Sequence, residues 1–223
     1  DDPADRRSAC CRHCRTFKRM PPTLVLPVAA ATAAAAAAAV LLTYRRRRRR
    51  GDPPQWWSQL VASREALSVR EWSDPHWRGQ NGWLGTDYIH GAPAAVHIPG
   101  YVLRRGEHPQ LTGAVHFSEG AESHQGLCHG GTMCAVMDDV IGWTGFCADG
   151  DCNPWCGFTV QINTALKAPV KVGSWLRVEG EVSRREGARK VWVTARLVAP
   201  AAAGGEEVVH CTAEGLFVLK KRA

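Results

Sequence analysis

The strongest constraint on the fold is one apolar-faced helix that is followed by four strands in succession. Six residues between positions 133 and 144 recur at helical spacing and give a helix with one broad apolar face that ends near Gly150. They are Met133, Val136, Met137, Val140, Ile141 and Thr144. Four alternating or β-branched runs follow, at residues 158–167, 174–183, 190–198 and 208–219, with glycine turns between them. Strands that do not alternate with helices predict an antiparallel sheet of the α+β class, wrapped around the central helix.

The chain before this helix is predicted to contain a hairpin and a covering segment. Residues 101–104 and 111–118 have the pattern of two strands joined by a Gly-Glu-His-Pro turn. Hydrophobic residues from Trp56 to Leu67 have helical spacing, whereas residues 74–99, rich in Gly, Pro, Trp and His, are expected to be irregular. We therefore divide this part into a Trp-rich covering segment, residues 55–99, and a main domain, residues 100–223.

The basic excess of the chain lies entirely in its N-terminal quarter. Residues 1–54 hold 12 Lys and Arg against 4 Asp and Glu, whereas residues 55–223 hold 16 against 17. A nucleic-acid-binding domain carries its basic patch on the folded body. Because this body is neutral, we expect no nucleic-acid partner.

An uncharged run, residues 23–44, separates a polar tail, residues 1–22, from a basic block, residues 45–54, that begins with six arginines. As a helix the run spans ~33 Å, which matches the hydrocarbon core of a membrane. We predict a transmembrane helix that ends at the arginines. The remnant of a targeting sequence and an alanine-rich helix in water stay open as alternatives.

Nine cysteines at irregular spacing do not form the framework of a small secreted domain. We interpret most of them as reduced thiols of an intracellular compartment. Neither the cysteines near the N-terminus nor those of residues 147–156 have the ligand pattern of a zinc site, so we predict no metal and no cofactor.

Two motifs carry a resemblance to a known family. The first is His129-Gly130-Gly131 with Asp138 nine residues after the histidine, and the second is the strand at residues 157–163 with Pro169 behind it. Residues 100–220 resemble the hotdog-fold acyl-CoA thioesterases, and most closely the phenylacetate-degradation type and the thioesterase-superfamily-member type. The resemblance implies hydrolysis of acyl-CoA to a free acid and CoA.

The resemblance also implies roles for individual residues. Asp138 would be the general base or the nucleophile, and Thr159 would hold the water or the carboxylate. The amide of Gly130, at the positive end of the helix, would stabilise the developing oxyanion, and His129 would orient the loop. Substrate-binding positions would be Gly131, Ser123 and His124. The family pattern places Asp138 of one subunit against Gly130 of another, which implies a homodimer or a dimer of related hotdog subunits.

Other interpretations remain at several of these positions. Asp138 and Asp139 also fit a solvated helix face, and Ser123 stands where many family members have an Asn. Arg184, Arg185, Arg189 and Lys190 cluster at a predicted turn, which fits either CoA phosphates or plain solvation.

The rival function is a non-catalytic hotdog subunit of an organellar membrane complex. The predicted location is an organellar membrane, with the mitochondrial inner membrane favoured and a plastid as the alternative.

Overall fold

The computed structural model describes residues 51–63, 66–67, 70–90, 95–201 and 205–221. The polar tail, the predicted transmembrane helix at residues 23–44 and the six arginines that follow it lie outside this range. None of the helices in the described ranges is long and apolar enough to cross a membrane.

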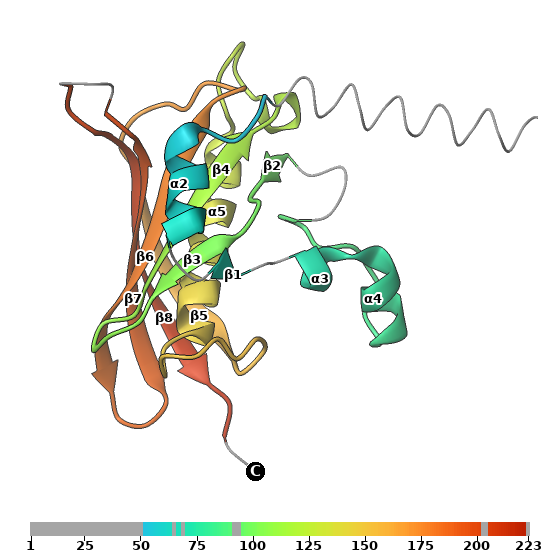
Figure 1. Cartoon of the computed structure of the whole chain (residues 1–223), viewed down its shortest axis with the longest axis vertical. Coiled ribbons are helices and arrows are strands. Elements are labelled where there is room, and N and C mark those ends of the chain that lie inside the picture. The colour runs from blue at the N-terminus through green and yellow to red at the C-terminus, as the bar shows by residue number, and fades with distance from the viewer. Residues whose placement is uncertain (1–50, 64–65, 68–69, 91–94, 202–204, 222–223) are drawn as a thin grey trace, which may run out of the picture. The chain divides into compact units, whose positions relative to one another are not determined.

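An antiparallel sheet forms the main domain (Figure 1). Its strands follow the order β1-β3-β4-β6-β7-β8-β5, and β2 pairs with β4 beside this path. The bounds are β1 Ala66–Leu67, β2 Val96–His97, β3 Tyr101–Arg104, β4 Gln110–Phe117, β5 Gly157–Leu166, β6 Trp175–Glu186, β7 Lys190–Ala199 and β8 Val208–Leu219. The six strands expected from the sequence are confirmed, with ends that differ by at most three residues.

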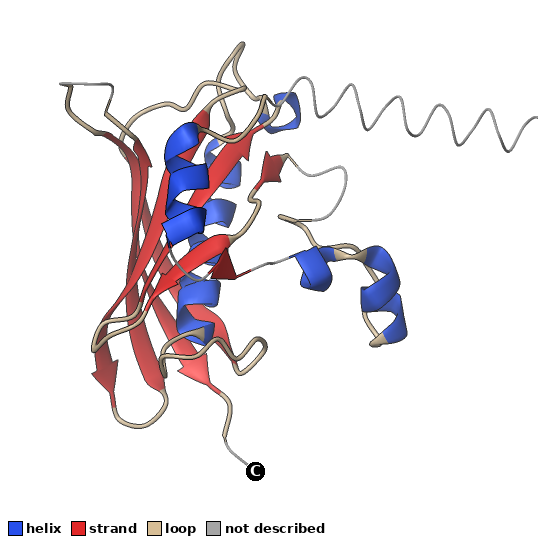
Figure 2. Cartoon of the chain, viewed as in Figure 1, coloured by secondary structure: helices blue, strands red, loops and turns tan. Residues whose placement is uncertain are grey.

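The central helix α5, Gly130–Phe146, packs against the sheet (Figure 2). All six residues of the predicted apolar face are buried. The helix lies close to the strands because glycines face it: a Cβ atom at Gly215 of β8 would lie 2.9 Å from the Ile141 side chain. The predicted α+β hotdog architecture, with a curved antiparallel sheet around one buried helix, is confirmed.

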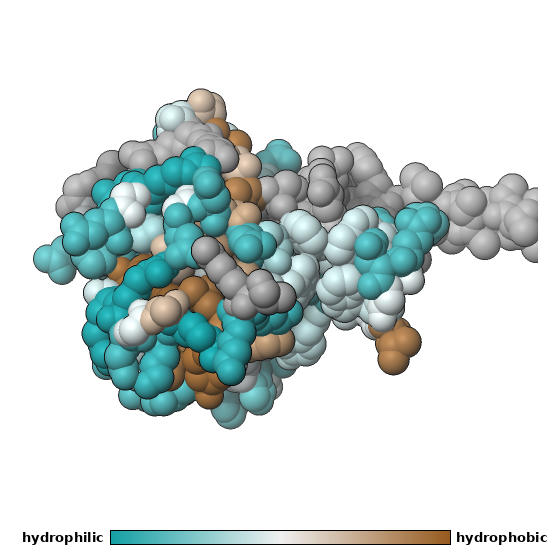
Figure 3. All heavy atoms as spheres, turned by 90° about the horizontal axis from the view of Figure 1, so that it is seen from below, coloured by the Kyte–Doolittle hydropathy of each residue, from teal (hydrophilic) through white to brown (hydrophobic). Residues whose placement is uncertain are grey.

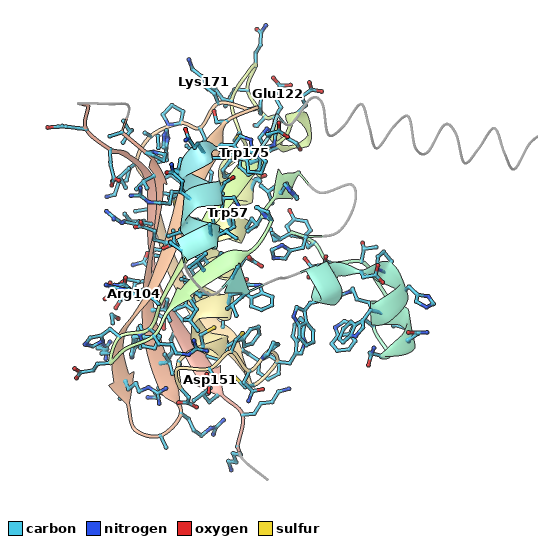
Figure 4. The ribbon with its side chains drawn as sticks, viewed as in Figure 1. Trp57, Arg104, Glu122, Asp151, Lys171 and Trp175 are labelled. Atoms are coloured by element: carbon cyan, nitrogen blue, oxygen red, sulfur yellow. The ribbon has the colours of Figure 1, made fainter. Side chains whose placement is uncertain are left out.

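A second helix, α2 (Gln55–Ser63), covers the opposite face of the sheet (Figure 1). Its Trp57 packs with Val102 and Ala114, whereas Tyr101 and Leu103 belong to the main core. Because successive side chains of a strand point to opposite faces, β3 separates the two clusters. Figure 4 labels Trp57 on this helix and Trp175 at the start of β6, and both belong to the smaller cluster.

Residues 75–80 are helical, although the sequence predicted irregular structure for residues 74–99. They form α4 (Pro75–Gln80), which follows the short helix α3 (Arg70–Ser73). Asp74 caps α4 by accepting a hydrogen bond from the Trp77 amide at 2.8 Å, and Pro75 occupies the first helical turn. This local signal, an Asp-Pro pair that starts a helix, was present in the sequence.

Candidate active site

The helix α5 begins with His129 as its N-cap. The Gly131 amide donates a hydrogen bond to the His129 Nδ1 atom at 2.8 Å, and the Thr132 amide donates to the His129 carbonyl at 3.0 Å. Among the described residues, none accepts a hydrogen bond from the Gly130 amide. The positive end of the helix therefore presents one free N–H, that of Gly130, whereas the Gly131 amide is already bonded to the His129 ring.

Leu166 of β5 lies beside Gly130. A Cβ atom at Gly130 would come within 2.8 Å of the Leu166 Cδ1 atom, and the Leu166 side chain is itself largely exposed. Only the far end of a flexible, exposed side chain stands next to the Gly130 backbone. A ligand that displaces Leu166 slightly can therefore approach the amide closely.

The predicted pair Asp138 and Thr159 is brought together. Asp138 lies on an exposed face of α5, and the Thr159 hydroxyl of β5 donates a hydrogen bond to its carboxylate. Thr159 also lies near Gly142, one turn further along α5, since a Cβ atom at Gly142 would lie 3.7 Å from the Thr159 Oγ1 atom. The structure thus places a hydroxyl against a carboxylate at the edge of the sheet.

Three effects act on the pKa of Asp138. Desolvation by the surrounding protein raises it, the Thr159 hydrogen bond lowers it, and the negative charge of Asp139 raises it, so that the pKa ends above its ordinary value. A carboxylate with a raised pKa is a stronger base than an ordinary surface carboxylate. This suits a general base that takes a proton from water.

An irregularity of β5 orients Thr159. In the pairing of β5 with β8, Thr159 is opposite Phe217 and Gln161 is opposite Leu216, so that one residue is bulged out between them. Phe217 is buried in the core, and therefore Thr159 faces the helix. Because a bulge shifts the alternation by one, Ile162 also faces the helix side, opposite Gly215.

Gly130 and Asp138 are separated along α5. Eight residues of helix correspond to about 12 Å, so one carbonyl group cannot contact both. Within one chain the structure joins Asp138 to Thr159 and His129 to Gly131, but it does not join these two pairs.

Ser123 and His124 occupy a turn at the end of the molecule where α5 begins. The Ser123 amide donates to the Leu127 carbonyl at 2.9 Å, and the Leu127 amide donates to the His124 carbonyl at 2.8 Å. The His129 amide, which donates to the Ala121 carbonyl at 2.7 Å, holds the turn beside the helix start. Figure 4 marks this end by the label of Glu122. Both predicted side chains are exposed and lie near Gly130 but far from Asp138 of the same chain.

The neighbouring carboxylate, Asp139, has a different environment that the sequence analysis missed. The Tyr101 hydroxyl donates to its Oδ2 atom at 2.5 Å, and the His90 Nε2 atom lies 3.1 Å from its Oδ1 atom. The His90 and Asp139 side chains are 5% and 13% exposed. Trp143, one turn further along α5, contacts both the His90 and the Tyr101 rings. Asp139 therefore ties the covering segment to the helix. No signal in the sequence connects Asp139 with Tyr101 and His90, which lie 38 and 49 positions before it.

Burial and charge act in opposite directions on His90. Burial lowers its pKa, but the Asp139 carboxylate, the more distant Asp87 and the Ile98 carbonyl raise it, and the net shift is upward. Burial, followed by the charge of Asp139, holds the pKa of Tyr101 well above its ordinary value. His90 and Tyr101 thus share one carboxylate, which raises the pKa of both side chains.

The cysteine next to the start of α5 does not offer a second candidate nucleophile. Burial raises the pKa of the Cys128 thiol to about 11, so it is not a nucleophilic thiolate at neutral pH. In the described part of the chain, no group of three or more His, Cys, Asp or Glu residues is arranged to hold a metal ion.

The comparison with protein families decides the relationship. Residues 125–194, which include the start of α5, Asp138 and Thr159, match the model of the thioesterase superfamily. This segment, about a third of the chain, is similar to that superfamily. The match supports thioester hydrolysis in general as the activity of the segment.

Solved thioesterases are among the structures that this chain is similar to. The zebrafish thioesterase superfamily member 2 is 15% identical, with 69% of this chain and 99% of that chain covered and a TM-score of 0.47. An acyl-CoA hydrolase of Staphylococcus aureus, solved with butyryl coenzyme A, coenzyme A and coenzyme A disulfide, is 17% identical, with 50% and 66% covered and a TM-score of 0.44. No curated protein sequence matches the chain significantly.

Proposed function

We propose that this protein is an acyl-CoA thioesterase whose site is completed by a second copy of the chain. Asp138 with Thr159 from one subunit and the Gly130 amide from the other surround the thioester carbonyl. The hydrogen bond between Asp138 and Thr159, on a face of α5 that the chain itself leaves open, is the observation that carries the proposal.

The chemistry follows from these groups. Asp138 takes a proton from water, the resulting hydroxide attacks the thioester carbon, and the Gly130 amide stabilises the negative charge on the carbonyl oxygen. The tetrahedral intermediate then expels the CoA thiolate and leaves the free acid. Direct attack by the carboxylate, with hydrolysis of the resulting anhydride, uses the same residues.

The edge strand β5 supports the requirement for a second copy. Among the described strands it pairs only with β8, and its large apolar side chains are exposed. These are Phe158, Val160, Ile162 and Leu166, with exposures of 61%, 58%, 38% and 52%. An exposed apolar edge next to the candidate site is suited to pairing with the same edge of another chain.

Hydrolysis is tested on the full chain with acyl-CoAs of several lengths by the release of free CoA thiol. We expect turnover with at least one of them, and a loss of at least about 100-fold in kcat for Asp138→Asn. Glu206→Gln, at an exposed loop carboxylate, is the matched control and should keep the full rate. The absence of turnover on every thioester would contradict the proposal and favour the non-catalytic subunit of a membrane complex.

The shared site is tested by mixing two inactive variants. Gly130→Pro removes the amide hydrogen but keeps the helix, because proline is accepted at the first helical position and His129 already has extended backbone angles. Mixed with Asp138→Asn and allowed to exchange subunits, it should restore roughly a quarter of the wild-type rate, because each mixed dimer has one intact site. No recovery, with mixed dimers present, would mean that each chain works alone.

The arginine cluster of the β6–β7 turn separates into two groups. Arg184 lies over the Trp192 ring, and Lys190 pairs with Glu186 at 2.8 Å, away from any pocket that contains the other two arginines. Arg185, which pairs with Asp149, and Arg189, which donates to the Leu219 carbonyl, line a surface pocket of about 720 Å³ together with Lys220 and Lys221. We assign the CoA phosphates to this second group, and Arg189→Ala should raise KM more than it lowers kcat.

Attachment to an organellar membrane is the part of the proposal that rests on the sequence alone. Residues 23–44 are uncharged and end at six arginines, the pattern of a membrane span. The full chain should stay in the membrane fraction at alkaline pH, and a variant with Ala35 and Ala36 replaced by Asp should leave it. A full chain that is recovered without membranes would refute the anchor, whether or not hydrolysis is found.

A further inference from the structure

The loop between α5 and β5 contains three cysteines close together. Cys147 is the C-cap of α5, and Cys152 and Cys156 follow within nine residues. Figure 4 shows this loop, with Asp151 labelled, at the end of α5 opposite the candidate oxyanion amide. Figure 3 views the molecule from this end and shows mostly hydrophilic residues around a smaller hydrophobic area. All three cysteines are free thiols.

The backbone folds back so that Cys152 returns to Cys147. The Gly150 amide donates to the Cys147 carbonyl at 2.9 Å, and the Asn153 amide donates to the Phe146 carbonyl at 2.9 Å. Gly150 supports this turn with a φ of 95°, which glycine adopts without strain. The bond between residues 153 and 146 brings Cys152 opposite Cys147, and Cys152 packs against the hydrophobic cluster that contains Cys147. Two cysteines five positions apart thus face each other across one turn.

The two thiols are not equivalent. Cys147 is fully buried, whereas Cys152 is half-buried. The neighbouring Cys147 thiol lowers the pKa of Cys152, whereas Cys152 and burial raise the pKa of Cys147. Burial raises the pKa of Cys156 and of Cys211, the latter to about 11. A more accessible sulfur that ionises readily beside a buried thiol is the arrangement of an attacking and a resolving cysteine.

We propose that Cys147 and Cys152 form a reversible intramolecular disulfide by exchange with a low-molecular-weight disulfide of the glutathione type. The Cys152 thiolate attacks one sulfur of that disulfide, forms a mixed disulfide and releases one thiolate. Cys147 loses its proton to solvent and attacks the Cys152 sulfur, which releases the second thiolate. Two protein thiols become one protein disulfide, and the small disulfide is reduced to two thiols.

The bond would join the end of α5 to the wall of the basic pocket. Asp149, Asn153 and Cys156 line that pocket with Arg185. Asp149 is paired with Arg185 at 2.5 Å, and its position lies inside the loop that the disulfide closes. Oxidation therefore fixes one side of the pocket without touching Asp138 or Thr159. The inference does not depend on hydrolysis.

The bond is tested by mass spectrometry of the full chain after incubation with oxidised glutathione and blocking of the remaining thiols. Cleavage before Asp and after Lys and Arg places Cys147 in the peptide 139–148 and Cys152 with Cys156 in the peptide 151–167. We expect these two peptides to be linked, and the link to be lost in Cys147→Ser and in Cys152→Ser. Cys156→Ser is the matched control and should keep it.

A second measurement addresses the order of attack. In the Cys147→Ser variant the exchange should stop at a glutathione adduct on Cys152, and alkylation of Cys152 should be at least about tenfold faster than that of Cys128. A link that persists in Cys152→Ser through Cys156, unlinked peptides after incubation, or equal labelling of Cys152 and Cys128 would each overturn the proposal.

Discussion

Two adjacent carboxylates of α5 have opposite environments. Asp138 is exposed, lies against the Thr159 hydroxyl of an edge strand and is beside an apolar face of that strand. Asp139 is largely buried and shared by His90 and Tyr101. One residue of helix turns a side chain by about 100°, which is enough to separate a candidate catalytic face from a structural one. The pair shows that an Asp-Asp dipeptide on an amphipathic helix cannot be interpreted as one unit.

The largest effect is expected at the exposed member of the pair. Asp138→Asn should reduce kcat by about 10³-fold and leave the free energy of unfolding within about 0.5 kcal/mol of the wild type, because no buried group loses a partner. Initial rates and urea unfolding measure the two quantities. Equal losses of activity and of stability would erase the contrast between the two residues.

The buried member should act on stability. Asp139→Ala leaves a buried histidine and a buried hydroxyl without their partner, and we expect it to lower the free energy of unfolding by about 3 kcal/mol. Urea unfolding with Glu206→Gln as the control measures the loss. A change below about 1 kcal/mol would mean that the covering segment is held by its other contacts, such as those of Trp72 and Trp83 with Trp155.

A smaller effect is expected from the hydroxyl that faces Asp138. Thr159→Val keeps the shape of the side chain but removes the hydrogen bond that lowers the pKa of Asp138. We expect kcat to fall about tenfold and the acidic limb of the pH–rate profile to move to higher pH, because the base must be ionised. A limb that moves to lower pH would mean that the Thr159 hydroxyl does not lower the pKa of Asp138.

The smallest expected effect is the pH dependence of the buried trio. The pKa of His90 is higher in the folded chain than in the unfolded chain, so its stabilisation is complete below about pH 6.5 and is lost as the pH rises through the folded value. The stability difference between the wild type and His90→Asn should therefore shrink with increasing pH. A difference that grows toward alkaline pH would mean that His90 is neutral beside Asp139.

Much of this molecule was predictable because burial along one element follows a local period. The apolar positions of α5 recur every three or four residues, and the strands alternate, so their existence and approximate ends follow from short windows of sequence. The positions of Gly130, Asp138 and Thr159 came from motifs that resemble a family, and the structure brings Asp138 and Thr159 into contact. The Asp74-Pro75 helix start was equally local and was overlooked.

Other features depended on side-chain rotamers or on how distant segments pack. The Gly131 amide donates a hydrogen bond to the His129 ring, and this bond depends on the rotamer of the His129 side chain. The bulge at residues 159–161 is a property of the pairing of β5 with β8. The contacts of Asp139 with His90 and Tyr101 join segments far apart in the chain.

The sequence by itself determined which residues form the helix and the strands, because periodicity is local. Only the tertiary structure decided which carboxylate is buried and which is open, because that depends on what packs against each side of the helix.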